Sequence, residues 1–166
     1  MADVFTKAKR SEVMARIRGR GNKDTELALT RLLRAHGLTG WRRHKTLIVR
    51  SSRRKKAHSS TRKTVRASSP RLLRVKPDFD FPQLRLAIFV DGCFWHVCPQ
   101  HATWPANRAA WWRQKLLGNQ ARDRLVTRTL RRAGWRVLRV WEHELARKHE
   151  ARLLRRIQTE FRQENG

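Results

Sequence analysis

The segment from Leu86 to His101 constrains the fold of this chain more than any other part of its sequence. It opens with a short apolar run, Leu86–Val90, which predicts a buried strand. The residues that follow hold both cysteines of the chain, two histidines, an aspartate and a Phe-Trp pair. Because binding and catalytic residues often lie where a strand ends and a loop begins, this loop is the first candidate for a functional site.

The chain is strongly basic. Its 40 Lys and Arg against 13 Asp and Glu give 166 residues a formal net charge of +27. Such a surface attracts polyanions, above all nucleic acids, and a basic character without a specific partner is the alternative. No long apolar segment, signal peptide or basic helix with a broad apolar face is found, so we expect no membrane contact and a cytoplasmic, nucleoid-associated protein.

The length predicts a single domain over residues 1–166 with one core, and we expect a monomer. Hydrophobic periodicity and turn residues predict the following order: a helix that ends before Gly37, a strand over 73–81, a turn at 82–83, a strand that ends at Val90, a helix over 107–133, a strand over 135–141 and a helix over 144–161. This order predicts an α/β fold with a mixed sheet flanked by helices.

Two segments stand apart from this pattern. Residues 1–22 are predicted to form a loose N-terminal arm with a short helix after Ser11. Residues 50–71 are rich in Arg, Lys, Ser and Thr and have few large apolar side chains, which predicts a flexible basic insertion in a surface loop. This insertion either contacts phosphates or is a solvated loop without a specific role.

A metal site is the first chemical candidate. Cys93, Cys98 and His101 supply three ligands from one loop, and His143 follows the last predicted strand. Four nitrogen and sulfur ligands suit a tetrahedral structural zinc ion. Two buried free cysteines with two surface histidines are the alternative.

Acidic residues form the second candidate. Asp78 follows a proline within a predicted strand, and Asp91 ends the next strand. Nucleases of the restriction-endonuclease fold hold Mg²⁺ with a Pro-Asp followed by Asp/Glu-x-Lys, but here Cys93 stands at the lysine position, so that signature is incomplete. Asp123 shares a face of the long helix with Trp112 and Asn119, and a salt bridge to a nearby arginine is the alternative for it.

His96 is the candidate acid/base group, because an imidazole exchanges protons near neutral pH. It could instead bind zinc, although this would crowd one short loop. Phe94, Trp95 and Trp112 are candidates for wedging between base pairs, and packing in the core is the alternative for them.

These residues together resemble the very short patch repair endonucleases, bacterial enzymes that nick DNA beside T·G mismatches. The resemblance is carried in the family's order by MADVFTKAKRSEVMARIRG, DTELALTRLL, KPDFDFP, FVDGCFWHVCPQH, WWRQKLLGNQARDR and GWRVLRVWEHEL. It implies a restriction-endonuclease-like core, a structural zinc ion and Mg²⁺-dependent hydrolysis. The basic insertion lies outside the segments that carry the resemblance.

The resemblance also implies roles for single residues. Asp78 corresponds to the catalytic metal-binding aspartate, Val90 to a residue whose carbonyl binds Mg²⁺, and His96 to the catalytic histidine. Asp123 and Glu26 correspond to further catalytic acids, and Asp91 stands where the best-known members have a catalytic-site histidine. The DNA contacts implied are Met14 in an arm that clasps DNA, the wedges Phe94, Trp95 and Trp112, and the polar contacts Lys115 and Asn119.

We therefore expect an endonuclease that nicks one strand 5′ of the thymine in a T·G mismatch. Its cofactors would be catalytic Mg²⁺ and structural Zn²⁺. Its partners would be duplex DNA with a T·G mismatch and mismatch-repair proteins. Another restriction-like nuclease of the same fold and a non-catalytic, zinc-stabilised DNA-binding protein are the alternatives.

Overall fold

The computed structural model describes residues 25–51 and 71–162 of the chain. The predicted N-terminal arm, with Met14, and residues 52–70 of the predicted insertion lie outside these residues. The elements in chain order are α2 (Glu26–Ala35), β1 (Arg42–Arg43), β2 (Leu47–Ser51), β3 (Arg71–Val75), β4 (Phe79–Phe81), β5 (Leu86–Asp91), α3 (Ala109–Arg132), β6 (Arg136–Trp141), two 3₁₀ turns (Glu142–Leu145 and Arg147–His149) and α4 (Glu150–Arg162).

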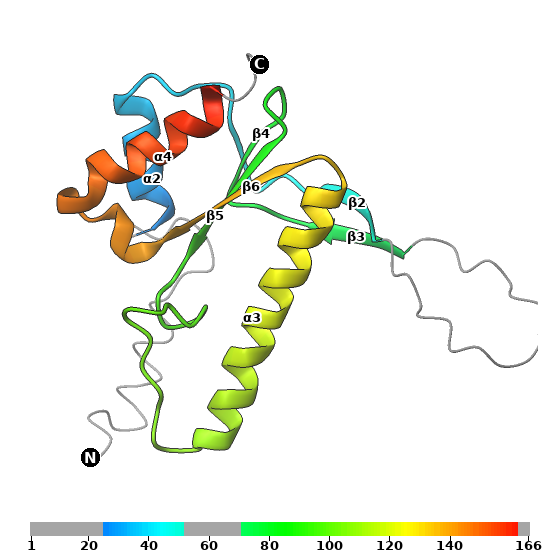
Figure 1. Cartoon of the computed structure of the whole chain (residues 1–166), viewed down its shortest axis with the longest axis vertical. Helices are drawn as coiled ribbons and strands as arrows, with labels where there is room; N and C mark the ends of the chain where they lie inside the picture. The colour runs from blue at the N-terminus through cyan, green and yellow to red at the C-terminus, as the bar shows by residue number, and fades with distance from the viewer. Residues whose placement is uncertain (1–24, 52–70, 163–166) are drawn as a thin grey trace, which may run out of the picture.

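The main sheet is mixed and has the strand order β1-β4-β5-β6. β4 is antiparallel to β1 and β5, whereas β5 and β6 are parallel and are joined through α3. A parallel neighbour requires such a crossover connection. β2 and β3 form a separate antiparallel hairpin. The predicted mixed sheet flanked by helices is thus confirmed (Figure 1).

Each face of the sheet has its own hydrophobic core. α2 and α4 lie together on one face, where residues such as Leu33 and Ile157 pack against Phe79 and Ile88. The end of α3 and the β2–β3 hairpin cover the other face around Ala87 and Leu130. Because side chains alternate along a strand, Ala87, Phe89 and Asp91 of β5 all belong to the face that α3 covers.

Two predicted elements differ from the observed ones. The predicted strand over 73–81 is wrong: β3 and β4 are two strands in different sheets, separated at Lys76–Asp78. Pro77 lies in this break, and a proline cannot donate to a strand ladder. The final helix begins at Glu150 rather than near Glu144, because the extended backbone of Ala146 separates two 3₁₀ turns before it.

The structure also tests the predictions about the basic insertion, the glycines that end helices and the membrane. Arg50 and Ser51 are paired with Leu72 and Arg71, so the ends of the predicted insertion belong to strands. Gly37 and Gly134 have positive φ angles of 64° and 78° directly after α2 and α3, as expected for glycines that end helices. Among the described residues, no helix is both long and apolar enough to span a membrane.

α3 extends well beyond the edge of the sheet. Its last turns hold the core residues Thr129 and Leu130, whereas in its first half only Leu116 is buried. Figure 1 shows this first half alongside the long connection from β5 rather than over the sheet. The loop that follows β5 therefore lies beside a helix in this region.

Candidate active site and metal centre

Glu26, His44 and Asp78 form the first group of candidate residues. Their ligand atoms lie within 4.8 Å of one another. Glu26 begins α2, His44 follows β1 and Asp78 precedes β4, so the pairing of β1 with β4 brings the last two together. The Glu26 carboxylate accepts from Arg43 Nη2 at 2.5 Å and lies 2.9 Å from His44 Nε2.

Asp78 is a carboxyl group in an environment that disfavours its charge. Burial, opposed by a hydrogen bond from the Val90 N–H and assisted by the charge of Glu26, raises the pKa of Asp78 to about 6. The Val90 N–H donates to Asp78 Oδ2 at 2.8 Å. Since the N–H and C=O of one strand residue point to the same edge, the Val90 carbonyl also faces Asp78. This arrangement of oxygen atoms suits a hard divalent cation.

His96 and Asp123 form the second group. His96 Nδ1 lies 2.6 Å from Asp123 Oδ2, which joins the loop after β5 to α3. A carboxylate can only accept, so Nδ1 carries the proton and Nε2 is the ring nitrogen that can exchange a proton with water or a leaving oxygen. This geometry does not favour the alternative in which His96 binds zinc.

The charges around His96 stabilise its protonated form. Burial disfavours the imidazolium, but the hydrogen bond with Asp123 and the charges of Asp91 and Asp123 outweigh it, so the pKa of His96 is raised. For Asp123, burial acts to raise the pKa, but the bonds and charges of His96 and Arg139 lower it. The alternative of a salt bridge to an arginine is confirmed, since Arg139 Nη2 lies 3.0 Å from Asp123 Oδ1, and the site role of Asp123 stays a prediction.

Asp91 links the two groups. It is 3% exposed, and its Oδ1 lies 3.6 Å from His96 Nδ1. Its negative charge also contributes to the raised pKa of Asp78. Asp91 itself is held by Arg139, whose Nε and Nη2 lie 2.5 and 2.6 Å from the two carboxylate oxygens.

A cleft of about 640 Å³ opens beside His96. α3 forms one wall, with Gln120, Arg124, Thr127 and Arg128 at the spacing of one helix face. Cationic side chains next to the His96–Asp123 pair suit a substrate that carries phosphates.

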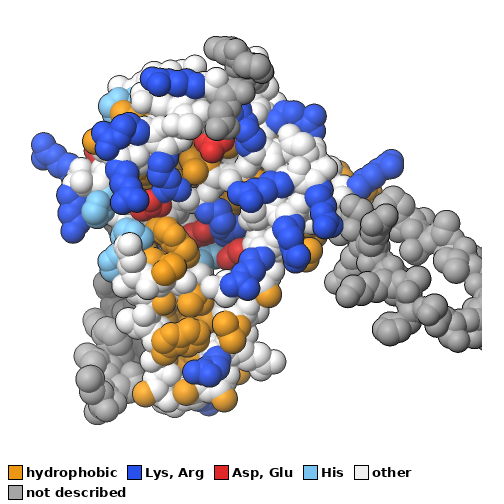
Figure 2. Space-filling model, in the orientation of Figure 1, with side chains coloured by type: hydrophobic (Ala, Val, Ile, Leu, Met, Phe, Trp, Pro, Cys, Tyr) orange, Lys and Arg blue, Asp and Glu red, His pale blue; other side chains and the backbone are white. Residues whose placement is uncertain are grey.

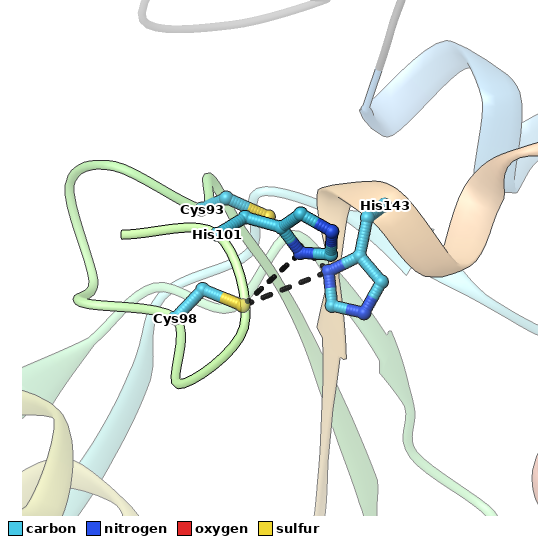
Figure 3. A group of neighbouring side chains, drawn as sticks. All are labelled: Cys93, Cys98, His101 and His143. Atoms are coloured by element: carbon cyan, nitrogen blue, oxygen red, sulfur yellow. Dashed lines mark hydrogen bonds between the residues drawn. The ribbon is translucent and has the colours of Figure 1, made fainter. Parts of the chain in front are cut away.

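The four predicted zinc ligands converge. Cys93 Sγ lies 3.3 Å from His143 Nδ1, and Cys98 Sγ lies 3.7 Å from Nδ1 of both His101 and His143. Figure 3 shows Cys93, Cys98 and His101 on the loop after β5, facing His143 from the turn after β6. Bonds of 2.3 Å to sulfur and 2.0–2.1 Å to nitrogen at tetrahedral angles imply sulfur–nitrogen separations of about 3.5 Å, close to those observed.

The pKa values of two members of this group are shifted in opposite directions. Burial and the neighbouring Cys98 raise the pKa of the Cys93 thiol. Burial and His101 lower the pKa of His143, which favours the neutral imidazole that binds metals. A bound divalent cation would take the two sulfurs as thiolates, because a cysteine must lose its proton to ligate a metal. The Cys93 N–H also donates to Glu142 Oε2 at 3.1 Å, which fixes the loop.

An aromatic cluster lies between the loop and the exposed half of α3. Phe94, Trp95 and Trp112 are half-buried, with ring centroids 5.1–6.0 Å apart. Asn119 donates to the Trp95 carbonyl at 3.1 Å, so this residue supports the loop. Trp111, the neighbour of Trp112 in α3, is 54% exposed. The cluster is partly solvent-exposed and so does not correspond to an ordinary core.

The surface around these groups is basic. Figure 2 shows Lys and Arg side chains spread over this face and hydrophobic side chains gathered in its lower half, in the region of the β5–α3 connection and the first half of α3. Lys115, one of the predicted DNA contacts, is exposed on α3. A polyanion can thus approach the aromatic cluster along positively charged surface.

Sequence reasoning missed two residues of the site. His44 follows a strand of only two residues, and no local pattern distinguishes it from the basic residues around it. Arg139 could have been predicted as a site residue from the sequence. In β6 it alternates with Leu138 and Val140, which pack in the core on the opposite face of the sheet. An arginine on the same face as Asp91 of the adjacent strand is a candidate partner for that carboxylate.

Comparison with known proteins gives an independent result. Residues 64–101 match the family described as DNA mismatch endonuclease Vsr. The chain is 54% identical over 72 residues to the type II nicking enzyme V.NaeI of Lentzea aerocolonigenes, which covers 43% of each chain. It is 42% identical over 71 residues to the DNA mismatch endonuclease Vsr of Escherichia coli, which covers 40% of this chain and 44% of that protein.

A third similarity is longer and weaker. The chain is 28% identical over 150 residues to the type II nicking enzyme V.NmeAIP of Neisseria meningitidis, which covers 89% of this chain and 87% of the relative. The two more similar relatives are matched over less than half of their length. The matched family segment includes Asp78, Asp91, His96 and three of the four converging cysteine and histidine ligands.

Proposed function

We propose that this chain is a DNA mismatch endonuclease of the Vsr family and that it nicks one strand of duplex DNA 5′ of the thymine in a T·G mismatch, by divalent-metal-dependent hydrolysis. The fold proposed is the restriction-endonuclease-like one. The observation that carries the proposal is the His96–Asp123 pair, 2.6 Å apart, with Asp91 between it and the group of Glu26, His44 and Asp78.

Asp78 and the Val90 carbonyl would hold Mg²⁺. The residues fit this ion, since a buried carboxyl with a pKa raised to about 6 lies close to a second carboxylate and beside a backbone carbonyl. When bound, Mg²⁺ would polarise the scissile phosphate and lower the pKa of a bound water. Glu26 and His44 would complete the surroundings of the ion.

His96 would move the proton. Asp123 holds the imidazole at Nδ1, which leaves Nε2 to take a proton from the attacking water or to give one to the leaving oxygen. The water oxygen forms a bond to phosphorus and the bond from phosphorus to O3′ breaks. The products are a 3′-hydroxyl, which gains a proton, and a 5′-phosphate.

The aromatic cluster of Phe94, Trp95 and Trp112 would recognise the mismatch. Apolar side chains that enter a base step unstack it and kink the duplex. A wobble pair is less well stacked than a matched pair, so its deformation costs less free energy. Lys115 would contribute a contact to the DNA, and Asn119 would hold the Trp95 backbone in place. Met14, outside the described residues, would contact DNA from the N-terminal arm.

Zinc would occupy the group of Cys93, Cys98, His101 and His143. The donor separations support a tetrahedral ion with no open position, which suits a structural role. Three ligands from the loop and one from the turn after β6 would hold the aromatic side chains of that loop against α3.

A strand-labelled T·G duplex tests the proposal. The wild-type chain is expected to nick only the thymine strand and only with Mg²⁺, whereas Asp78→Asn should bind the duplex without cutting it. Equal cutting of matched duplexes would indicate another nuclease of the same fold. Binding without any cutting by wild type would indicate a zinc-stabilised DNA-binding protein.

A further inference from the structure

Arg139 is held between the two carboxylates that flank His96. Its Nε and Nη2 lie 2.5 and 2.6 Å from the Asp91 oxygens, and Nη2 also lies 3.0 Å from Asp123 Oδ1. We infer that Arg139 is a positioning residue: by binding Asp91 it makes Asp123 the carboxylate that orients the His96 ring. The inference rests on the proposed role of His96 in hydrolysis.

Two carboxylates compete for one ring nitrogen. His96 Nδ1 lies 2.6 Å from Asp123 Oδ2 and 3.6 Å from Asp91 Oδ1. A single N–H makes one strong hydrogen bond, so the ring direction depends on which acceptor it finds. Both Asp91 oxygens already accept from Arg139, and this fork geometry favours a fixed Asp91 that does not turn toward the ring.

Arg139 itself is rigidly placed. It lies opposite Phe89 in the β5–β6 register, and its guanidinium lies 5.1 Å from the centroid of the Phe89 ring. The Arg139 backbone carbonyl accepts from Arg156 Nη2 at 3.0 Å, which adds a contact to α4. The guanidinium therefore joins β6 to β5 and to α3 at the point where the acid/base pair lies.

Loss of this guanidinium would leave a buried charge. Asp91 is 3% exposed, so without Arg139 its carboxylate would lack its two close cationic contacts. Its oxygens would then be free to accept from the His96 ring in competition with Asp123. The Nε2 atom would turn away from the position that Asp123 gives it.

Arg139→Met, Asp91→Asn and the double variant test the inference. Arg139→Met is expected to lower kcat about 10- to 100-fold with little change in KM, because the defect is one of ring placement. Adding Asp91→Asn should restore part of kcat, since the competing carboxylate is gone. Arg85→Met is the matched control: it also removes one positive charge and a hydrogen bond, to the Ala133 carbonyl, but lies outside the site.

Nitrogen NMR of the histidine ring gives a readout that does not depend on nicking. The Nδ1–H signal of His96, bonded to Asp123, should shift or vanish in Arg139→Met and return in the double variant. Arg139→Lys, which keeps the charge but not the fork, should give a weaker shift in the same direction and serves if Arg139→Met fails to fold.

Unchanged His96 signals in a folded Arg139 variant, or a double variant no better than Arg139→Met, would overturn the inference. A wild type that does not nick would refute the proposed function. The NMR measurement would still decide whether Arg139 selects the partner of His96.

Discussion

His143 Nδ1 lies 3.3 Å from Cys93 Sγ, although the two residues are 50 positions apart in the sequence. β5 and β6 are parallel neighbours, so the loop after one strand and the turn after the other begin at the same edge of the sheet. The parallel pairing therefore determines where a shared ion could lie. It also determines which part of the molecule would respond to loss of that ion.

Removal of zinc should destabilise the protein. We expect the purified wild-type chain to carry one zinc ion. At a free zinc concentration about 1,000-fold above the Kd, binding adds about 4 kcal/mol to the free energy of unfolding, and a chelator should remove this contribution. Elemental analysis and thermal unfolding with and without chelator measure both effects. Cys98→Ser should lack the ion and be insensitive to chelator, whereas Asp78→Asn should retain it. A wild type equally stable with chelator would contradict a structural zinc.

Asp78→Asn should stabilise the folded chain in Mg²⁺-free buffer at neutral pH. The pKa of Asp78 is about 6 in the folded state against 3.8 for the unperturbed group, so between these values the folded state binds more protons. The contribution of this group to the free energy of unfolding therefore falls as the pH rises through that window. At pH values above the window the total loss is roughly 3 kcal/mol. Urea unfolding at about pH 4 and about pH 8 checks this. The variant should gain stability over wild type only at the higher pH.

Asp123→Asn should reduce nicking about 10²- to 10⁴-fold, as expected when a catalytic base loses its orientation. Asp123 helps to raise the pKa of His96, so in the variant the His96-dependent limb of the pH–rate profile should move to lower pH. A raised histidine pKa contributes stability below the unfolded pKa that is lost as pH rises through the folded value. The effect also needs an ionised Asp123, whose pKa is lowered, so the variant should lose most stability between the ordinary pKa values of aspartate, 3.8, and histidine, 6.5, and less above the pKa of His96. A pH–rate profile with an unmoved limb would argue against the pair.

Trp95→Ala should lower the preference for T·G over matched duplexes about 10- to 100-fold, because unstacking a base step involves a few kcal/mol. Single-turnover nicking of both duplexes measures this ratio. Trp104→Ala is the control: Trp104 is 49% exposed and packs against Arg113 rather than in the aromatic cluster. Equal losses of preference in both variants would remove the wedge role from Trp95.

The sequence predicts best where one loop contains the chemistry. The strand that ends near Asp91 and the convergence of Cys93, Cys98 and His101 with His143 follow from ligand spacing and from a strand followed by a helix and a strand. The boundary near Pro77 was less predictable, because the alternation of apolar residues continues from β3 into β4 although the strands belong to different sheets.

Residues that join distant segments were the hardest to predict. His44 reaches Asp78 only through the pairing of β1 with β4, and a two-residue strand carries no periodic signal. Arg139 becomes informative only once the register of β6 against β5 is known. In a chain with so many arginines, composition alone cannot show which one contacts Asp91.

The β2–β3 hairpin has a consequence for how this chain can vary. Its ladder runs from Leu47–Val75 to Ser51–Arg71, and its inner residues pack on the face that α3 covers. Ser51 and Arg71 hold the two ends of the intervening segment side by side. The entropy of closing a flexible connection between two paired strands increases only slowly with its number of residues. The hairpin is therefore a natural place for homologues to differ in size, and for a fluorescent tag or a fused binding domain to be added.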